Sequence, residues 1–404
     1  MSMFEEKNLS WYSRSSLLNH FQMDKERIIE TLNTHDCKTA LLTLLNDAKQ
    51  EYLGDKAYPF ELRQITFYSN PASDVKRYKD FEIPKKSGGT RKISAPVEGL
   101  KIILKCMNMI LQEIYEPSKY AMGFAKNRSV VDNARRHINQ NYVFNIDLKD
   151  FFPSITRARI CARLKVKPFE FSDDIARMIS GLCTMKVTDG ENIKYVLPQG
   201  APTSPTLTNI ICDKLDHKLA GLAKRFGLNY SRYADDITFS SSHNVYQEES
   251  DFRKELQRII TEDGFVINDK KTRLQKRGGR QEVTGVIVCE KANVTKKYVK
   301  EIRNLLYIWE RYGYDEAVKR FHPRYKAEKG YTKKGNPNLD AVLGGKLLYL
   351  KMVKGENDSV YKRLQGKYDH LMEVKNPIIN QTDNQTNNEA LISELENLLD
   401  ELLK

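Results

Sequence analysis

The chain has 404 residues, of which 40% are hydrophobic and 29% charged, the balance of a folded protein with room for two or three domains. No run of about 18 apolar residues occurs, which argues against a membrane span, and the polar Met1–Ser10 carries no secretion signal. The six cysteines form no CxxC pair, which argues against a zinc site. We therefore expect a cytoplasmic protein.

The net charge of +13 is concentrated in one segment of the chain. Residues 291–375 contain 20 Lys and Arg against 10 Asp and Glu, a net charge of +10. A basic segment of this size indicates a surface for the phosphate backbone of a nucleic acid, because each neutralised phosphate releases counterions. A solvated lysine-rich surface is the alternative.

The N-terminal third is predicted to form helices followed by a mixed segment. Residues 1–55 form an N-terminal helical extension, with a leucine-rich helix over Ala40–Leu53. Residues 56–140 combine strand-like pieces with an amphipathic helix over Lys101–Tyr115. They also contain a hairpin over Ile83–Ile93, whose turn carries lysines and glycines.

The rest of the chain alternates strands and helices before its composition changes. The predicted strands are Tyr142–Leu148, Tyr230–Tyr233, Ile237–Ser240 and Glu282–Cys289, and helical spacing over residues 291–375 follows them. Residues 376–388 are rich in Asn, Gln and Thr, which predicts a linker. Leu391, Leu395, Leu398 and Leu402 then mark a short acidic helix, which needs either another chain or the basic domain as its partner.

Two adjacent carboxylates give the strongest local signal. Asp235 and Asp236 end the segment Tyr233-Ala-Asp-Asp, between two strand-like runs. An Asp pair in a hairpin is usually only a turn. Here Ile237 and Phe239 alternate with polar residues, which indicates a half-buried hairpin with both carboxylates at its tip. Two adjacent anions repel each other unless a cation lies between them.

A third carboxylate, Asp147, directly follows residues 142–146, near the end of the predicted strand Tyr142–Leu148. An aspartate at a strand end is common and indicates nothing alone. Together with Asp235 and Asp236, however, it could bind a pair of Mg²⁺ ions, which prefer carboxylate and backbone oxygens. Two such ions about 3.5–4 Å apart would bind both oxygens of an in-line phosphoryl displacement.

Four segments in order resemble the motifs of the reverse transcriptases. They are Asn145–Ser154, Leu197–Pro205, Tyr233–Asp236 and Gly264–Lys271, within a resemblance that covers about residues 60–375. The third matches the YxDD box that separates these enzymes from viral RNA polymerases with GDD. The resemblance implies an α+β right-hand polymerase fold, with an antiparallel palm sheet, α+β fingers and a helical thumb.

The domains implied by this resemblance follow the predicted elements. The fingers are residues 56–140 with part of 157–195, the palm is 141–290, and the basic helical thumb is 291–375. Residues 1–55 precede them as the helical extension, and 376–404 follow as a flexible linker with a short amphipathic helix.

The resemblance also assigns roles to site residues. Asp147, Asp235 and Asp236 would bind two Mg²⁺ ions, or Mn²⁺, with the Leu148 carbonyl as a further ligand. Phe152 would be the steric gate that excludes a ribose 2′-OH, with a core aromatic as the alternative. The other residues expected to bind the deoxynucleoside triphosphate are Lys85, Lys86, Arg91, Gln199, Gly200 and Lys270. Lys271 is the alternative to Lys270 as the acid that protonates pyrophosphate.

Two further patterns resemble the retron reverse transcriptases. Asn133-Ala-Arg-Arg-His137 is similar to their NAxxH element, and Val283-Thr284-Gly285 matches their VTG triplet. We expect Asn133, His137 and the triplet to contact RNA, although a buried histidine and a strand ending are the simpler interpretations.

Membership of the retron group implies specific partners and products. The enzyme would bind a noncoding RNA, prime from a guanosine 2′-OH in it, and copy part of it into branched single-stranded DNA (msDNA). An effector protein in phage defence, or self-association through the C-terminal helix, would complete the assembly. The alternatives are a group II intron, abortive-infection or diversity-generating reverse transcriptase, or a non-catalytic RNA-binding protein with the same fold.

Overall fold

The computed structural model of the protein describes residues 25–34, 36–54, 57–73, 75–85, 88–329 and 335–375. The chain divides into two compact units, Met1–Thr284 and Gly285–Lys404, whereas we predicted the palm to end at residue 290. The predicted linker and helix over residues 376–404 lie outside the described residues. Within the described part, no helix has both the length and the apolar character that crossing a membrane requires.

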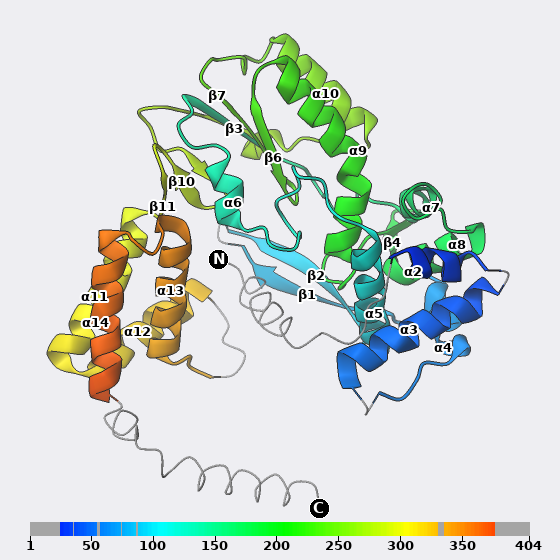
Figure 1. The fold of residues 1–404 in the computed structure, drawn as a ribbon, viewed down its shortest axis with the longest axis horizontal. Helices are drawn as coiled ribbons and strands as arrows, with labels where there is room; N and C mark the ends of the chain where they lie inside the picture. The colour runs from blue at the N-terminus through cyan, green and yellow to red at the C-terminus, as the bar shows by residue number, and fades with distance from the viewer. Residues whose placement is uncertain are drawn as a thin grey trace, which may run out of the picture. The chain divides into compact units, whose positions relative to one another are not determined.

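A four-stranded antiparallel sheet forms the centre of the first unit (Figure 1). In spatial order its strands are β6 (Asn229–Tyr233), β7 (Asp236–Ser241), β3 (Tyr142–Asp147) and β8 (Arg273–Lys276). The predicted strands on either side of the Asp pair, and the one that ends at Asp147, are all present in it. The antiparallel palm sheet is therefore confirmed.

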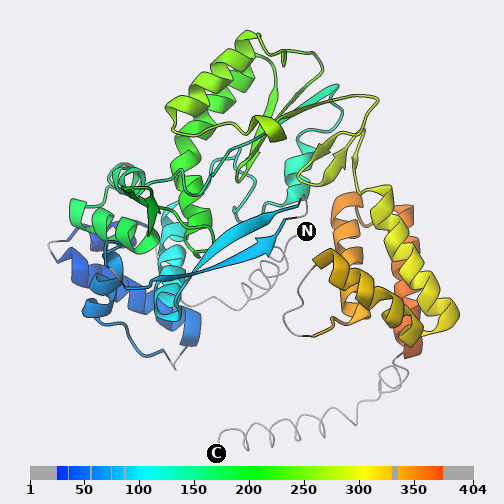
Figure 2. The ribbon, with the colours of Figure 1, turned by 180° about the vertical axis from the view of Figure 1, so that it is seen from behind.

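Two helices lie along one side of this sheet, α9 (Ser204–Arg225) and α10 (Asp251–Glu262) (Figures 1 and 2). Phe239 of β7 meets Phe252 of α10 edge to face, with ring centroids 5.2 Å apart. Along α10, Phe252, Leu256, Ile259 and Ile260 recur at helical spacing and are all buried. Burial of apolar side chains between the sheet and these helices therefore stabilises the strands whose ends carry the aspartates.

Two of the N-terminal helices, α2 (Lys25–Leu32) and α3 (Cys37–Leu53), pack against α5 (Glu98–Ile114), which corresponds to the predicted amphipathic helix. Between α3 and α5 in the sequence lies α4 (Leu62–Ser69). The leucine-rich helix is thus α3, which ends at Gly54 with a φ of 71°, a conformation that favours glycine. The predicted hairpin is present as β1 (Tyr78–Pro84) and β2 (Thr90–Pro96).

Several shorter elements complete the first unit. They are α6 (Val130–Arg135), α7 (Arg157–Leu164), α8 (Asp173–Cys183), the hairpin of β4 (Met185–Asp189) and β5 (Asn192–Val196), the 3₁₀ helix η3 (Asp269–Lys271), and β9 (Glu282–Val283).

The second unit is mainly helical. After the paired strands β10 (Val286–Val288) and β11 (Ala292–Asn293) come α11 (Lys296–Tyr312), α12 (Tyr314–Lys329), α13 (Leu339–Lys354) and α14 (Ser359–Lys375). The helical spacing predicted for residues 291–375 is present in α11, where Ile302, Leu305, Leu306 and Trp309 are buried.

One predicted strand, Glu282–Cys289, is wrong as a continuous element. The chain forms β9 and β10 instead, separated by Thr284 and Gly285. These two residues have φ values of 48° and 86°, which lie outside the range of an extended strand. The hydrophobic run indicated a strand correctly on each side of the break, but the backbone is not extended at the two residues between them.

Candidate active site

The three predicted metal-binding aspartates lie together at one end of β3 and β7, the two inner strands of the palm sheet, and in the turn next to them. Asp147, the last residue of β3, is the cross-strand partner of Asp236, the first residue of β7. Tyr233 also pairs with Asp236, so only Ala234 and Asp235 form the turn between β6 and β7. The backbone N–H of Leu148 donates to the carbonyl of Asp235 at 3.0 Å, which ties this turn to the end of β3.

Burial and mutual repulsion both act on these carboxylates. The pKa of Asp236 is raised to about 7, first by burial and then by the negative charges of Asp235 and Asp147. Burial, followed by the charge of Asp147, also raises the pKa of Asp235. The positive charges of Lys271 and Arg91 lower it. A cation bound among the carboxylates would relieve this repulsion.

Lys271 supplies a positive charge to the cluster. Its Nζ lies 2.7 Å from Asp147 Oδ1, and Asn268 Nδ2 donates to Asp147 Oδ2 at 3.0 Å. The backbone N–H of Asn268 donates to the carbonyl of Asp147 at 2.8 Å, which holds η3 against the end of β3. Lys270, the predicted nucleotide-binding residue, is exposed on η3. Of the two lysines, Lys271 is therefore the one that contacts an aspartate.

The carboxylates of the three aspartates are suitable ligands for a divalent cation, although their oxygens do not converge on one metal position. Among the described residues, no three His, Cys, Asp or Glu side chains meet in a metal-binding group. Both side-chain oxygens of Asp147 are instead engaged by Lys271 and Asn268. Carboxylates are nevertheless the hard ligands that Mg²⁺ and Mn²⁺ prefer.

The fingers hairpin presents Arg91 on a defined face. Strands β1 and β2 pair Ile83 with Arg91 and Phe81 with Ile93, so these four side chains share one face. Arg91 is exposed, and its charge acts on Asp235. Lys85 is exposed at the turn, where its N–H donates to the carbonyl of Gly89 at 2.9 Å. Lys86 lies outside the described residues.

Gln199 and Gly200 contact the second strand of this hairpin. The N–H of Ser94 donates to the Gln199 carbonyl at 2.9 Å. Gly200 has a φ of 134°, and a Cβ there would lie 2.8 Å from Ile93 Cγ2 and 2.9 Å from the Ser94 carbonyl oxygen. We expected Gly200 to bind the nucleotide; in the structure, the backbone that approaches this glycine closely is that of β2.

Phe152 lies half-buried five residues after Asp147. Its ring meets Phe151 edge to face at 5.6 Å, and Phe151 in turn packs on Phe265 at 5.6 Å. Phe151 is the core aromatic of the pair, with 4% of its surface exposed. Phe152 thus packs on a buried aromatic ring and keeps an accessible surface, and its role as a steric gate stays a prediction.

The retron-type elements form a buried network rather than an open surface. Asn133 and His137 are 1% and 0% exposed, and Val283 is also buried. His137 hydrogen-bonds through Nδ1 to Ser240 Oγ and through Nε2 to Ser231 Oγ, each at 2.7 Å. This placement favours a structural role over the RNA contact that we predicted for these side chains, because their polar atoms are engaged inside the protein. Thr284 is partly buried, and Gly285 is exposed.

Sequence reasoning did not single out Asn268. It also did not single out the buried Arg232 and Asp216, which lie next to the turn that carries Asp235. One signal was present for the latter: an arginine at position 232, inside a strand that has to be buried. A charge in such a strand indicates a specific partner.

The comparison with protein families agrees with this geometry. Residues 83–303, more than half of the chain, match the family model described as reverse transcriptase (RNA-dependent DNA polymerase). The matched range includes all three aspartates, the hairpin residue Arg91 and the Gln199–Gly200 loop. The chain therefore belongs to the reverse transcriptase family.

Its curated relatives show that it is of the retron type. The retron Mx65 reverse transcriptase of Myxococcus xanthus is 37% identical over 247 residues, which cover 59% of this chain and 57% of that protein. The retron Ec86 reverse transcriptase of Escherichia coli is 36% identical over 231 residues, covering 56% of this chain and 68% of that protein. The retron Ec73 reverse transcriptase, also of Escherichia coli, is 34% identical, covering 55% and 74%.

Among solved structures, telomerase from Candida albicans aligns over 81% of this chain and 70% of that chain. The TM-score is 0.42 and the sequence identity 11%, so the likeness is weak.

Proposed function

We propose that the chain is the RNA-directed DNA polymerase of a retron and copies part of a cognate noncoding RNA into msDNA. The observation that carries this proposal is the pairing of Asp147 with Asp236 across β3 and β7, with Asp235 in the adjoining turn. Three carboxylates at the ends of adjacent antiparallel strands are suited to template-directed nucleotidyl transfer.

Asp147, Asp235 and Asp236 would bind two Mg²⁺ ions, or Mn²⁺, together with the Leu148 carbonyl. What the ions supply when bound is activation of the attacking hydroxyl and neutralisation of the leaving pyrophosphate. Lys271 has to leave Asp147 Oδ1 for that oxygen to bind a cation, because the two positive charges compete for it. Its ammonium group is then positioned to donate a proton to pyrophosphate.

The nucleotide would lie between the fingers hairpin and the palm. Lys85 and Arg91 are exposed on the hairpin and would bind the triphosphate, with the Arg91 guanidinium donating paired hydrogen bonds to phosphate oxygens. The Gln199–Gly200 backbone would lie under the incoming nucleotide. The accessible surface of Phe152 would exclude a ribose 2′-OH and so favour deoxynucleotides.

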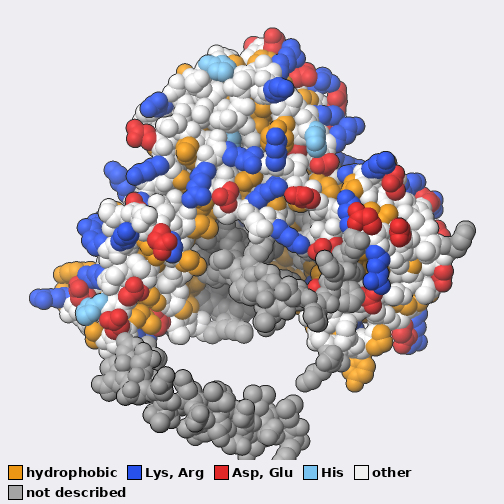
Figure 3. All heavy atoms as spheres, viewed as in Figure 1, with side chains coloured by type: hydrophobic (Ala, Val, Ile, Leu, Met, Phe, Trp, Pro, Cys, Tyr) orange, Lys and Arg blue, Asp and Glu red, His pale blue; other side chains and the backbone are white. Residues whose placement is uncertain are grey.

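The second unit would bind the RNA as the thumb. Lys296, Lys300, Arg303 and Tyr307 of α11 recur at spacings of four, three and four and are all exposed, so they share one face. The first turn of α11 contains no acidic residue. Lysines there oppose the helix dipole, so they favour phosphate binding over helix stability. On the face drawn in Figure 3, basic and acidic side chains are interspersed and do not form one uniform basic patch.

The assembly that we propose is cytoplasmic and contains the RNA, its DNA product and either an effector protein or a second copy of the chain. Residues 389–404 would make that protein contact through Leu391, Leu395, Leu398 and Leu402. Deletion after Lys375 should then preserve synthesis on a generic primed template but abolish co-purification with the partner. Retention of every complex by the deletion variant would contradict this proposal. We propose that the complete assembly acts in antiviral defence.

Nucleotide incorporation on a primed RNA template tests the polymerase activity. The wild type should extend the primer with deoxynucleotides in Mg²⁺ or Mn²⁺, whereas Asp236→Asn should not. This variant should melt at or above the wild-type temperature in metal-free buffer, because one of three repelling charges is removed. Extension by the variant at the wild-type rate would contradict the assignment of the site. A wild type that binds RNA without extending a primer would instead indicate the non-catalytic alternative.

Co-expression with the RNA encoded beside the gene tests the retron assignment. The expected product is single-stranded DNA that keeps a covalently attached ribonucleotide branch after ribonuclease treatment. DNA with a free 5′ end would instead indicate another bacterial reverse transcriptase.

A further inference from the structure

A buried ion pair lies directly behind the turn that carries Asp235. Arg232 of β6 and Asp216 of α9 are both fully buried. Arg232 Nε donates to Asp216 Oδ1 and Nη2 donates to Oδ2, each at 2.7 Å, which is a two-pronged contact. Burial of such a pair costs free energy of desolvation, so its presence next to a functional turn requires an explanation.

The remaining guanidinium contacts extend into the turn itself. Arg232 Nη1 donates to the carbonyl of Ala234 at 3.2 Å, and Nη2 also donates to Asn209 Oδ1 at 3.2 Å. Ala234 has a φ of 57°, a left-handed conformation that is unfavourable for a residue other than glycine. Arg232 therefore holds Ala234, the strained residue that precedes Asp235, by a hydrogen bond to the Ala234 carbonyl oxygen.

A second segment, residues 120–123 before α6, also contacts this turn and the strand that leads into it. The Arg232 N–H donates to the Tyr120 carbonyl at 2.9 Å, and Met122 N–H donates to the Arg232 carbonyl at 2.7 Å. A Cβ on Gly123 would lie only 2.8 Å from the backbone nitrogen of Ala234. The backbone of the turn therefore rests against the backbone of residue 123.

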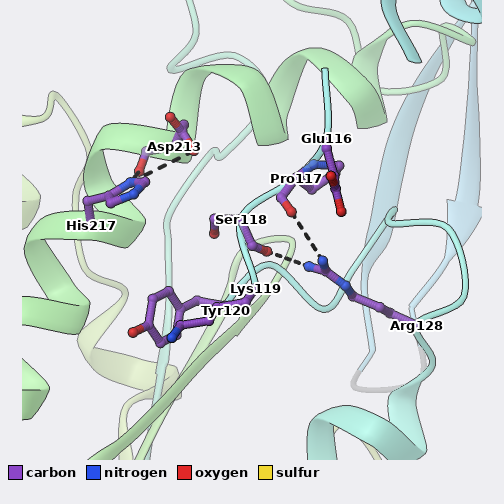
Figure 4. Close-up of a pocket in the computed structure, with 8 residues that line it drawn as sticks. All are labelled: Glu116, Pro117, Ser118, Lys119, Tyr120, Arg128, Asp213 and His217. Atoms are coloured by element: carbon purple, nitrogen blue, oxygen red, sulfur yellow. Dashed lines mark hydrogen bonds and ion pairs between the residues drawn. The ribbon is translucent and has the colours of Figure 1, made fainter. Parts of the chain in front are cut away.

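Figure 4 shows how the preceding part of this segment is fixed. Arg128 donates to the carbonyls of Pro117 and Ser118, while Asp213 and His217 of α9 line the other side of the same surface pocket. Ser118 Oγ donates to Asp216 Oδ2 at 3.2 Å. The chain of contacts thus runs from this segment through Asp216 and Arg232 to Ala234.

We infer that Arg232 and Asp216 are positioning residues for catalysis. They act through Ala234 to set the orientation of Asp235 and Asp236 toward Asp147. This inference rests on the proposed polymerase function, but the geometry that it concerns is that of the turn itself. The role requires a guanidinium, because a lysine ammonium donates from one point and cannot reach both the Asp216 carboxylate and the Ala234 carbonyl.

Arg232→Lys, with Tyr230→Phe as its matched control, tests this inference. The Tyr230 hydroxyl donates to the same Asp216 Oδ1 at 2.7 Å from a buried position in the same strand, but it does not contact the turn. We expect both variants to lose thermal stability. Only Arg232→Lys should also lower kcat, by on the order of 10–100-fold, because small displacements of catalytic groups have effects of this size. The KM for deoxynucleotide should stay within about twofold, since the variant leaves the hairpin that binds it intact.

Binding of Mn²⁺, followed by electron paramagnetic resonance on the protein without substrates, gives a readout that does not depend on activity. Arg232→Lys should weaken Mn²⁺ binding, and Tyr230→Phe should not. If Arg232→Lys fails to fold, Asn209→Ala should show a smaller loss of the same kind, because it removes one neutral partner of the guanidinium and the hydrogen bond from Asn209 Nδ2 to the Gly123 carbonyl beside the same turn. Equal Mn²⁺ affinity and kcat in wild type and the folded variants would overturn the inference. A wild type that binds Mn²⁺ but never extends a primer would overturn the proposed function instead.

Discussion

Asn133 Nδ2 donates to the Thr284 hydroxyl at 3.3 Å, which joins two residues 151 positions apart in the sequence. The same hydroxyl donates to the carbonyl of Val130, and Ser231 Oγ donates to Asn133 Oδ1 at 2.6 Å. The two retron-type elements are thus parts of one network that links α6, β6 and the end of β9. Their joint occurrence in the sequence has a physical reason, because each satisfies polar groups of the other.

Asn133→Ala should lower the free energy of unfolding by about 1–3 kcal/mol, because the Ser231 and Thr284 hydroxyls each lose a buried partner. RNA affinity, measured well below the melting temperature, should change less than about twofold, since the side chain lies inside the protein. Fluorescence-detected unfolding and filter binding measure the two quantities. A large loss of RNA affinity at unchanged stability would restore the predicted RNA contact.

Arg91→Ala should raise the KM for deoxynucleoside triphosphate by on the order of tenfold, because charge-assisted hydrogen bonds to phosphate are lost. Lys92→Ala is the matched control. Lys92 is the adjacent residue of β2, points to the opposite face of the hairpin and lies 2.8 Å from Asp80 Oδ2. Steady-state kinetics on a primed template would separate them, and equal effects of the two variants would exclude a specific role for Arg91.

Phe152→Val should reduce the preference for deoxynucleotides over ribonucleotides by about tenfold or more, since the ring no longer fills the space of a 2′-OH. Phe151→Leu provides the comparison, because Phe151 is the buried neighbour and its loss should affect stability only. The ratio of kcat/KM for the two nucleotide types is the measurement. Unchanged discrimination in an active Phe152→Val enzyme would assign Phe152 to the core.

Combined substitution of Lys296, Lys300 and Arg303 by Gln should make RNA binding less dependent on salt. The slope of log K against log salt should become less negative by about 2, because each lost phosphate contact removes about 0.7–0.9. The control combines Arg320→Gln, Lys351→Gln and Lys354→Gln, residues whose charges are paired with Glu316, Glu356 and Asp358. A similar change of slope in both triple variants would mean that the α11 stripe has no special role.

His137 should make the protein sensitive to acid. Burial, and then the charge of Arg136, lower the pKa of His137 to about 3. In the unfolded chain, a histidine side chain has a pKa of about 6.5. Between these values the unfolded state binds more protons, so the free energy of unfolding falls as pH falls, by up to about 1.4 kcal/mol per pH unit. Above pH 6.5 this contribution is fully present. Urea unfolding from pH 7.5 to 4.5 should show a shallower slope for His137→Gln, and parallel slopes would contradict the prediction.

The palm could be predicted from sequence because its signals are local. The alternation around Ile237 and Phe239, and the run that ends at Asp147, each define a strand without reference to the rest of the chain. Their antiparallel pairing then brings the three aspartates together. Resemblance to a known family added the order of the motifs and the expectation of a hairpin with Arg91.

Other features depend on contacts that the sequence does not show. Lys270 and Lys271 are adjacent and alike, and only the turn of η3 determines which ammonium group reaches Asp147. The burial of Asn133 is set by its contact with Thr284, far away in the chain. The break in the strand at Thr284 likewise involves a left-handed backbone that hydrophobic patterning does not predict.

The contact between Gly200 and β2 has a consequence for engineering of nucleotide selectivity. Because a Cβ at position 200 would collide with Ile93 and with the Ser94 carbonyl, the Gln199–Gly200 loop and the second strand of the fingers hairpin cannot be altered separately. A smaller residue at position 93 would not make room for a side chain at 200, since the Ser94 backbone would still obstruct it. Libraries that aim at new substrates should therefore keep Gly200 fixed and vary the exposed positions of the hairpin.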